Sequence, residues 1–146
     1  MKYATFKLDR GDIKFRLYSE TPIQVNRFIE NSSAGKFKGT TFYRVEPGFV
    51  VQSGPTAGAN ETPLWDEIKP PRRSKDNNFH AYGVLSAANA GGEHSSMGAF
   101  FICLSRIHTM HLDPGHTTFG HVIEGIELIE QIKLNEVIHD IIISES

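Results

Sequence analysis

The sequence has very little cysteine and no long apolar run. Its single cysteine, Cys103, cannot form a disulfide within the chain. It lies in the apolar run AFFICL, which favours a buried packing residue over a nucleophile. No apolar run approaches the ~18 residues needed to cross a membrane, and the N-terminal residues MKYATFKLDRGD lack the apolar stretch of a secretory signal. We therefore expect no membrane partner and a location in the cytoplasm.

Net charge is also small. A formal charge of −2 and an isoelectric point near 6.4 provide no attraction to nucleic acid or anionic lipid, so neither is an expected partner. The one basic cluster, RRSK at 72–75, follows two prolines and is typical of a solvated loop. The chain is 39% hydrophobic and 22% charged, as in ordinary globular domains. Its 146 residues fit one domain spanning 1–146, which we expect to be a monomer.

The common catalytic motifs are missing. Histidines 108, 111, 116 and 121 are close in sequence, but the only carboxylate among them is Asp113, and neither HExxH nor CxxC occurs. A zinc site needs three or four converging ligands, so we expect no metal. The sequence also lacks the GxSxG motif of serine hydrolases and the GxxxxGK[ST] loop that binds phosphates. These absences argue against a hydrolase and against a nucleotide cofactor.

Alternating hydrophobicity is the strongest structural signal. Apolar residues occupy every second position in 3–8 and 13–18, and the turn DRGD joins the two runs. This period predicts a hairpin with one buried face. Further strands are expected at 41–45, 49–52, 84–88, 99–104, 119–123 and 139–144. The pattern indicates a mainly β protein of about eight strands, a number that can close into an antiparallel barrel filled by side chains.

Two helices are expected to cap the barrel ends. The first runs from Thr21 to Gly35, with Thr21 as the N-cap and Pro22 in the first turn. The second is the amphipathic segment EGIELIEQIKL at 124–134. The remaining long stretches, 54–80 and 91–98, have no apolar periodicity and are expected to be surface loops.

One strand-like segment, FYRVEPGFVVQSG at 42–54, carries a charge at Arg44. A charge in such a run is costly unless it meets a partner or a ligand. Taken alone, Arg44 is more typical of a salt-bridged strand residue than of a binding residue. Phe49, Phe101 and Leu112, taken alone, are more typical of core residues than of a binding site.

Four separate segments, in order, resemble the cyclophilin-type peptidyl-prolyl cis–trans isomerases. They are FYRVEPGFVVQSG, GVLSAANAG, AFFICLS and HLDPGHTTFGHVIEG, and the helical segment ETPIQVNRFIE fits as well. The resemblance spans nearly the whole chain. It implies a closed eight-stranded antiparallel β-barrel capped by two α-helices, in agreement with the strand count.

The resemblance also assigns roles to residues. It implies that Arg44 is catalytic, that Gln52 orients it, and that the proline pocket is formed by Phe49, Phe101, Leu112 and His116. It implies a peptide-binding role for Val50, Ala88, Asn89, Ala99 and His111.

Three of these binding positions depart from the usual family residues. Val50 replaces a methionine, Ala99 a glutamine and His111 a tryptophan associated with tight cyclosporin binding, so only weak cyclosporin binding is expected. The implied activity is X-Pro isomerisation in proline-containing polypeptides, with no cofactor. The alternative is a non-catalytic module that binds proline peptides on the same fold.

Overall fold

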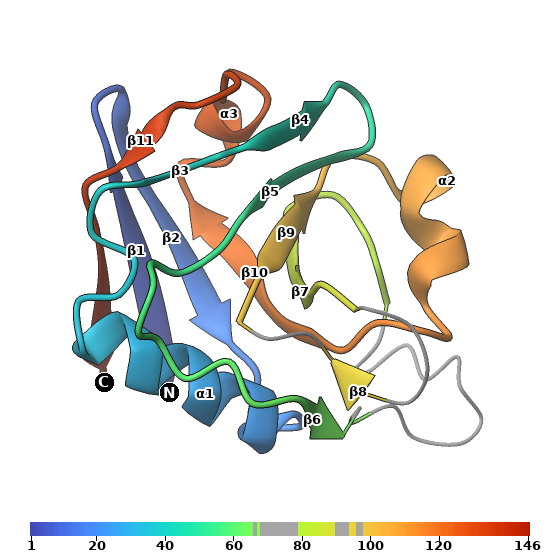
Figure 1. Ribbon diagram of the computed structural model, residues 1–146. Helices are drawn as coiled ribbons and strands as arrows, with labels where there is room; N and C mark the ends of the chain where they lie inside the picture. Colours follow the sequence, from blue (N-terminus) through green and yellow to red (C-terminus); the bar gives the residue numbers. More distant parts are fainter. Residues whose placement is uncertain (66, 68–78, 90–93, 96–97) are drawn as a thin grey trace.

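The computed structural model describes residues 1–65, 67, 79–89, 94–95 and 98–146. Its main sheet consists of β1 (Lys2–Leu8), β2 (Gly11–Leu17), β4 (Arg44–Glu46), β5 (Val50–Ser53), β7 (Val84–Ala87), β9 (Phe100–Cys103), β10 (Thr118–Glu124) and β12 (Asp140–Glu145). These strands pair in the order β12-β1-β2-β10-β7-β9-β5-β4, and every pair is antiparallel. The sheet curls around the core (Figure 1). The expected mainly β fold with eight antiparallel strands is confirmed.

A short second ladder bridges the two edges of this curled sheet. It joins β3 (Thr40–Thr41) to β11 (Val137–Ile138), the segments just before the edge strands β4 and β12. The expected strand 41–45 is therefore two strands, separated by the fully buried Phe42 and by Tyr43. The backbone N–H of Phe42 donates to the backbone carbonyl of Glu136 at 3.0 Å. In the described part of the chain, closure thus depends on this ladder and not on pairing between β4 and β12.

The core confirms the alternation read from the first hairpin. Successive inward positions of β1 and β2 are buried, namely Ala4, Phe6, Leu8, Ile13, Phe15 and Leu17. Phenylalanine rings fill much of the interior, and Phe6 packs against Phe15 with ring centroids 5.0 Å apart. Such rings bury large apolar areas, and their edge contacts add to this. The barrel interior is therefore a packed core.

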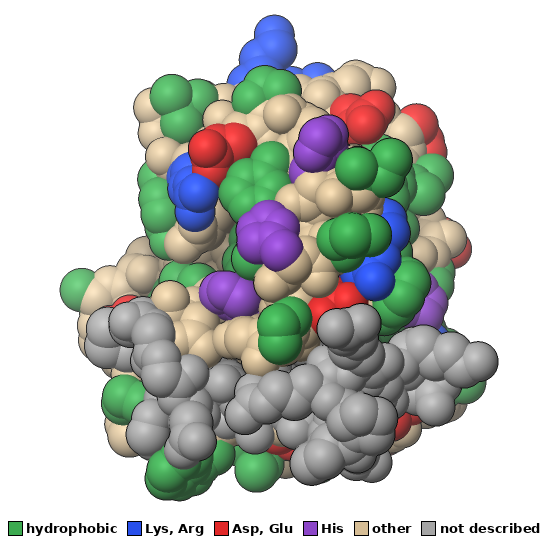
Figure 2. All heavy atoms as spheres, turned by 90° about the vertical axis from the view of Figure 1, so that its right-hand side faces the viewer, with side chains coloured by type: hydrophobic (Ala, Val, Ile, Leu, Met, Phe, Trp, Pro, Cys, Tyr) green, Lys and Arg blue, Asp and Glu red, His purple; other side chains and the backbone are tan. Residues whose placement is uncertain are grey.

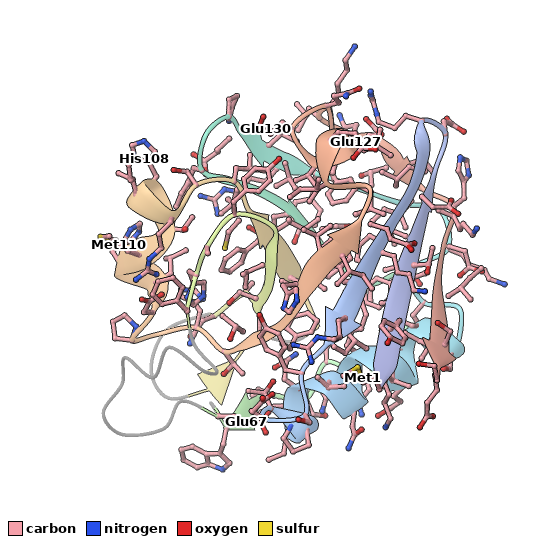
Figure 3. All side chains as sticks on the ribbon, turned by 180° about the vertical axis from the view of Figure 1, so that it is seen from behind. Met1, Glu67, His108, Met110, Glu127 and Glu130 are labelled. Atoms are coloured by element: carbon pink, nitrogen blue, oxygen red, sulfur yellow. The ribbon has the colours of Figure 1, made fainter. Side chains whose placement is uncertain are left out.

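Helix α1 (Pro22–Ser33) forms where expected but is capped differently. Thr21 occupies the N-cap position, yet its hydroxyl donates to the carbonyl of Thr118 at 3.0 Å and does not cap the helix. The carboxylate of Glu67 instead accepts the N–H groups of Ile23 at 3.0 Å and Gln24 at 2.7 Å. Figure 3 shows Glu67 beside the start of this helix. A negative group at this end is favourable for the helix dipole, although burial raises the pKa of Glu67.

The second expected helix, 124–134, is wrong in length. Only α3 (Ile126–Ile129) is helical, at the end of the sheet opposite α1 (Figure 1). Gly125 begins it at a φ of +80°, where a Cβ would lie 2.4 Å from the carbonyl oxygen of Asp12. Beyond it, Asn135 has a φ of +65° and donates its N–H to Phe42 at 2.7 Å. Pairing with Phe42 thus draws this segment out of the helix.

The helix α2 (Arg106–Thr109) and the 3-10 helix η1 (Met110–Leu112) lie between β9 and β10, where no helix was expected. The stretches 54–80 and 91–98, expected to be surface loops, lie in part outside the described residues, and their described parts include a small ladder between β6 (Leu64–Trp65) and β8 (His94–Ser95). No helix in the described residues is both long and apolar enough to cross a membrane.

We predict that Glu136→Gln lowers the melting temperature at pH 7 by a few degrees. Arg10 donates two hydrogen bonds of 2.8 Å to Glu136 beside the bridging ladder, and these hold the pKa of Glu136 below its ordinary value. A lowered pKa stabilises the fold above the unfolded-state pKa near ~4.3, and this stabilisation is lost as the pH falls through the folded-state pKa. Circular dichroism melts from pH 7 to 3 should therefore show the two proteins converging in acid. Glu127→Gln, on the exposed face of α3, is the control. A constant difference at all pH values would contradict the assignment.

Candidate functional site

The cleft is built on strands that are buried on both faces. In β5 and β9, Val51 and Ile102 point into the barrel core, whereas Val50, Phe101 and Cys103 form a second apolar cluster outside it. Burial on both faces explains why these segments read as continuous apolar runs in the sequence. The same two strands therefore close the core and supply an apolar platform for a site.

A cavity of about 220 Å³ lies on this platform and gathers nine of the eleven candidate residues. Its lining consists of Arg44, Phe49, Val50, Gln52, Ala88, Asn89, Phe101, Leu112 and His116. These come from β4, β5, β9 and η1, and from the segments that follow β4, β7 and η1. The face that carries α2 presents histidine and hydrophobic side chains next to one another (Figure 2).

Arg44 stands at the rim of this cavity, on the edge strand β4. Its side chain is 49% exposed, so its charge is not buried in the core. One guanidinium nitrogen donates to Oε1 of Gln52, the residue opposite in β5, at 3.1 Å. Another forms an ion pair with Glu46 on the same strand. The carbon at the centre of the guanidinium lies 6.0 Å from the ring centroid of Phe49. Arg44 therefore has both a partner and a place in the cleft.

Gln52 connects Arg44 to a residue that the sequence did not indicate. While Oε1 accepts from Arg44, Nε2 donates to the hydroxyl of Tyr43 at 3.3 Å. An amide used at both ends has one fixed orientation. Through Gln52, Tyr43 therefore helps to fix the orientation of the Arg44 guanidinium at the cavity.

The apolar walls are set by Phe101 and its neighbours. Phe101 is buried, and the ring of His116 meets it edge-on at 5.4 Å and 81°. Nδ1 of His116 lies 3.0 Å from the carbonyl oxygen of Ala87. Because a carbonyl only accepts, Nδ1 must carry the hydrogen. The imidazole is therefore held as a wall of the cavity by the end of β7.

Ala99 and His111 do not line this cavity. The carbonyl of Ala99 accepts the N–H of Ala88 at 3.0 Å, so it shapes the wall through the backbone. The ring of His111 is exposed and stacks on Phe49 with centroids 5.8 Å apart and an interplanar angle of 17°. It lines a neighbouring cavity of about 440 Å³ together with Met110 and Pro114.

Sequence reasoning missed a buried polar chain beneath the cavity. Nδ1 of His80 lies 2.9 Å from Asp113, and Nε2 lies 2.7 Å from Oγ of Ser86. Arg106 donates to both oxygens of Asp113, at 2.9 and 2.8 Å. Ser86 and Asp113 lay within recognised segments, but nothing in the sequence linked them to His80 or Arg106. Only the fold brings these four together.

The other residues singled out from the sequence do not converge. Within the described residues, no three histidine, cysteine, aspartate or glutamate side chains are grouped to hold a metal. His121, on β10, lies 3.2 Å from the hydroxyl of Tyr18, and burial lowers the pKa of His121. His108 is exposed on α2. The basic cluster at 72–75 lies outside the described residues.

Comparison with protein families gives one match over almost the whole chain. The family described as "Cyclophilin type peptidyl-prolyl cis-trans isomerase/CLD" matches residues 3–144. The peptidyl-prolyl cis-trans isomerase-like 2 of Cryptococcus neoformans is 33% identical over 139 residues, but the matched region is 90% of this chain and only 23% of that relative. The peptidyl-prolyl cis-trans isomerase-like 3 of Gallus gallus is 32% identical, covering 89% of this chain and 81% of the relative.

Solved structures agree with the sequence comparisons. A cyclophilin type peptidyl-prolyl cis-trans isomerase from Cryptosporidium parvum superposes with a TM-score of 0.79 and 26% identity, covering 99% of this chain and 98% of that one. A structure of the same protein in the presence of the dipeptide Ala-Pro gives 0.77 and 25%, covering 99% of both chains.

We predict that Cys103 does not react with thiol reagents in the folded protein. It is fully buried in the same apolar cluster as Phe101, and burial raises the pKa of its thiol to about 12. Since the thiolate is the reactive form, alkylation at pH 8 should require unfolding. Iodoacetamide labelling followed by mass spectrometry, with and without denaturant, measures this. Rapid labelling of the native protein would show that the platform opens.

Proposed function

The chain belongs to the cyclophilin-type peptidyl-prolyl cis-trans isomerase family, and from this premise we propose that it catalyses rotation about X-Pro peptide bonds in polypeptides. The observation that carries the proposal is the position of Arg44. Its guanidinium is held by Gln52 at the rim of a cavity in which the apolar walls Phe49, Phe101 and Leu112 face polar side chains. Such a cavity fits a small apolar ring with a polar bond at its edge.

The chemistry explains why an arginine is useful here. The peptide bond resists rotation because nitrogen donates its lone pair into the carbonyl, which gives a barrier of ~18–20 kcal/mol. In the twisted transition state the nitrogen regains that lone pair and becomes a better hydrogen-bond acceptor. A guanidinium beside it stabilises the twisted form more than either planar isomer, and such differential binding lowers the barrier. Because no bond is made or broken, the proposed reaction needs no cofactor.

The cavity walls are proposed to hold the proline while the bond turns. Phe49, Phe101 and Leu112 supply apolar surface, and His116 closes the side next to β7. The segment with Ala88 and Asn89 borders the cavity, where an extended peptide would lie. The Cryptosporidium parvum relative was crystallised in the presence of Ala-Pro, which supports short proline peptides as probes.

Magnitudes show that Arg44 does not act alone. A hydrogen bond to a charged group contributes ~1.5–3 kcal/mol, which corresponds to a rate factor of about 10 to 150. The ion pair with Glu46 competes for the same guanidinium. Both side chains are nearly half exposed, so releasing the pair costs under about 1 kcal/mol. Further acceleration must come from holding one side of the peptide bond still while the other side rotates.

That ion pair also favours the alternative function. If Glu46 keeps the guanidinium away from the proline nitrogen, the cavity binds a proline peptide without turning it over. The two functions share every wall residue and differ only in the use of Arg44. Turnover by the unmodified protein therefore decides between them.

We predict that Arg44→Ala lowers kcat/KM on an X-Pro tetrapeptide at least about tenfold. Its melting temperature should hardly change because the side chain is half exposed at the cavity rim. The kcat/KM of the conservative variant Arg44→Lys should lie between those of Arg44→Ala and the unmodified protein, since lysine keeps the charge and loses the planar guanidinium. A protease-coupled isomerisation assay measures all three. Full activity in Arg44→Ala would contradict the catalytic role, and peptide binding without turnover by the unmodified protein would support the binding module.

We predict that His111→Trp tightens cyclosporin binding at least about tenfold. The imidazole stacks on Phe49, and an indole in its place offers a broader apolar wall. A gain on the order of 60–100 Å² of contact corresponds to about 1.5–2.5 kcal/mol. Turnover of a short peptide should change less than about fivefold, because His111 does not line the cavity. Titration calorimetry tests the affinity, and equal values would show that this position does not reach the inhibitor.

A further inference from the structure

The buried chain beneath the cavity ties down every polar group of one residue, His80. Its backbone N–H donates to Oδ1 of Asp113 at 2.8 Å, and its two ring nitrogens meet Asp113 and Ser86. Its carbonyl accepts from Thr109 at 3.0 Å and from Arg106 at 3.1 Å. His80 itself is fully buried. Buried polar groups satisfied in this way give a unique and rigid arrangement.

The order carboxylate, imidazole, hydroxyl has the dimensions of a hydrolytic triad, but it does not serve as one. Ser86 is fully buried in the middle of β7, and its Oγ is also within 3.3 Å of the carbonyl of Thr117. A nucleophile must reach an electrophilic carbon, and this oxygen is buried and does not line the cavity. The chain therefore needs another explanation.

The hydrogen-bond partners on both sides of the ring fix the orientation of His80. Nδ1 faces a carboxylate that is already paired with Arg106, so Nδ1 carries a hydrogen. Nε2 lies 2.7 Å from Oγ of Ser86, which is also 3.3 Å from the carbonyl oxygen of Thr117, and the protonation state of the ring decides which of Nε2 and Oγ donates. Flipping the ring would put carbon atoms against both oxygens and break both contacts. The plane of the imidazole is therefore locked.

Two walls of the cavity rest on this locked ring. Phe101 stacks on it with centroids 6.0 Å apart and an interplanar angle of 19°. His116 meets it edge-on at 6.3 Å and 79°. The chain also holds Asp113, the residue that follows the wall residue Leu112. The imidazole of His80 thus fixes the orientation of the Phe101 ring and the position of the His116 ring.

We propose that His80, locked by Asp113 and Ser86, is a positioning residue that holds Phe101 and His116 in the geometry needed to grip the proline. The inference rests on the proposed function for its kinetic test. It assigns no substrate contact to His80, which acts only through the two rings packed on it. A cavity wall that moves by a fraction of an ångström loses contact with a small ring, so loss of the lock reduces catalysis without removing any group from the cavity.

The test compares two variants in the chain with one control outside it. Ser86→Ala removes one oxygen, and Asp113→Asn removes the charge while keeping the shape. Glu136→Gln weakens an ion pair at the far bridging ladder and serves as the control for lost stability. All are assayed at a temperature where circular dichroism shows each to be fully folded. Carbon-edited aromatic NMR spectra report the rings of Phe101 and His116 directly.

Ser86→Ala and Asp113→Asn are expected to lower kcat/KM about fivefold or more, which corresponds to about 1 kcal/mol. Glu136→Gln should stay within about twofold of the unmodified protein. Only the first two should shift the ring resonances of Phe101 and His116. Unchanged activity and resonances in Ser86→Ala would overturn the proposal, as would an equal loss of activity in Glu136→Gln. If Asp113→Asn does not fold, Ser86→Ala decides alone.

The test also separates this proposal from the proposed function. If the unmodified protein binds the X-Pro peptide without turnover, the isomerase function fails, and the same variants are compared by their Kd for that peptide. Weaker binding in Ser86→Ala, together with shifted ring resonances, then supports the positioning role. Equal Kd values overturn it.

Discussion

The site depends on the burial of β5 and β9 on both of their faces. One face, with Val51 and Ile102, completes the barrel core, and the other, with Val50 and Phe101, carries the cavity. Because side chains alternate along a strand, neither face can shift without the other. Register errors in the core would remove the cavity floor. The stability of the barrel and the geometry of the cleft are therefore one constraint.

Polar groups around this platform differ in how firmly they are held. His80 and Asp113 are buried and satisfied by several partners, and the rings packed on His80 share its rigidity. Arg44 lies on an edge strand, nearly half exposed, with partners that water can replace. The same cleft therefore has a rigid side and an adjustable side.

The sequence predicts most of the fold because local patterns and the global structure agree. Period-two alternation places Phe6 and Phe15 in the core correctly, and the four recognised segments place nine candidate residues around one cavity. The errors occur where distant residues decide. Pairing with Phe42 shortens the second helix, and a carboxylate far along the chain, Glu67, caps the first one in place of Thr21. No local pattern carries such information.

The same reason explains which parts of the site were missed. Period-two alternation places Glu46 on the same face as Arg44, but the pattern does not show whether the two side chains pair with each other or with other residues. Tyr43 reads as a strand residue, and its contact with Gln52 depends on the antiparallel register of β4 and β5. Nine of the eleven residues recognised by a motif line the cavity. Residues that hold them from behind become visible only in three dimensions.

The division into a rigid and an adjustable side has a physical use in the proposed reaction. During rotation the proline ring must stay still while the electrons on its nitrogen are redistributed. The walls packed against His80 can keep the proline ring still, since a buried ring with fixed hydrogen bonds moves little. A half-exposed guanidinium suits the second, because exchanging Glu46 for a changing acceptor costs little free energy. An arginine buried as firmly as His80 would be held by its protein partners and would be less free to follow the nitrogen. The exposed edge strand is therefore the part of this barrel where such a charge can work.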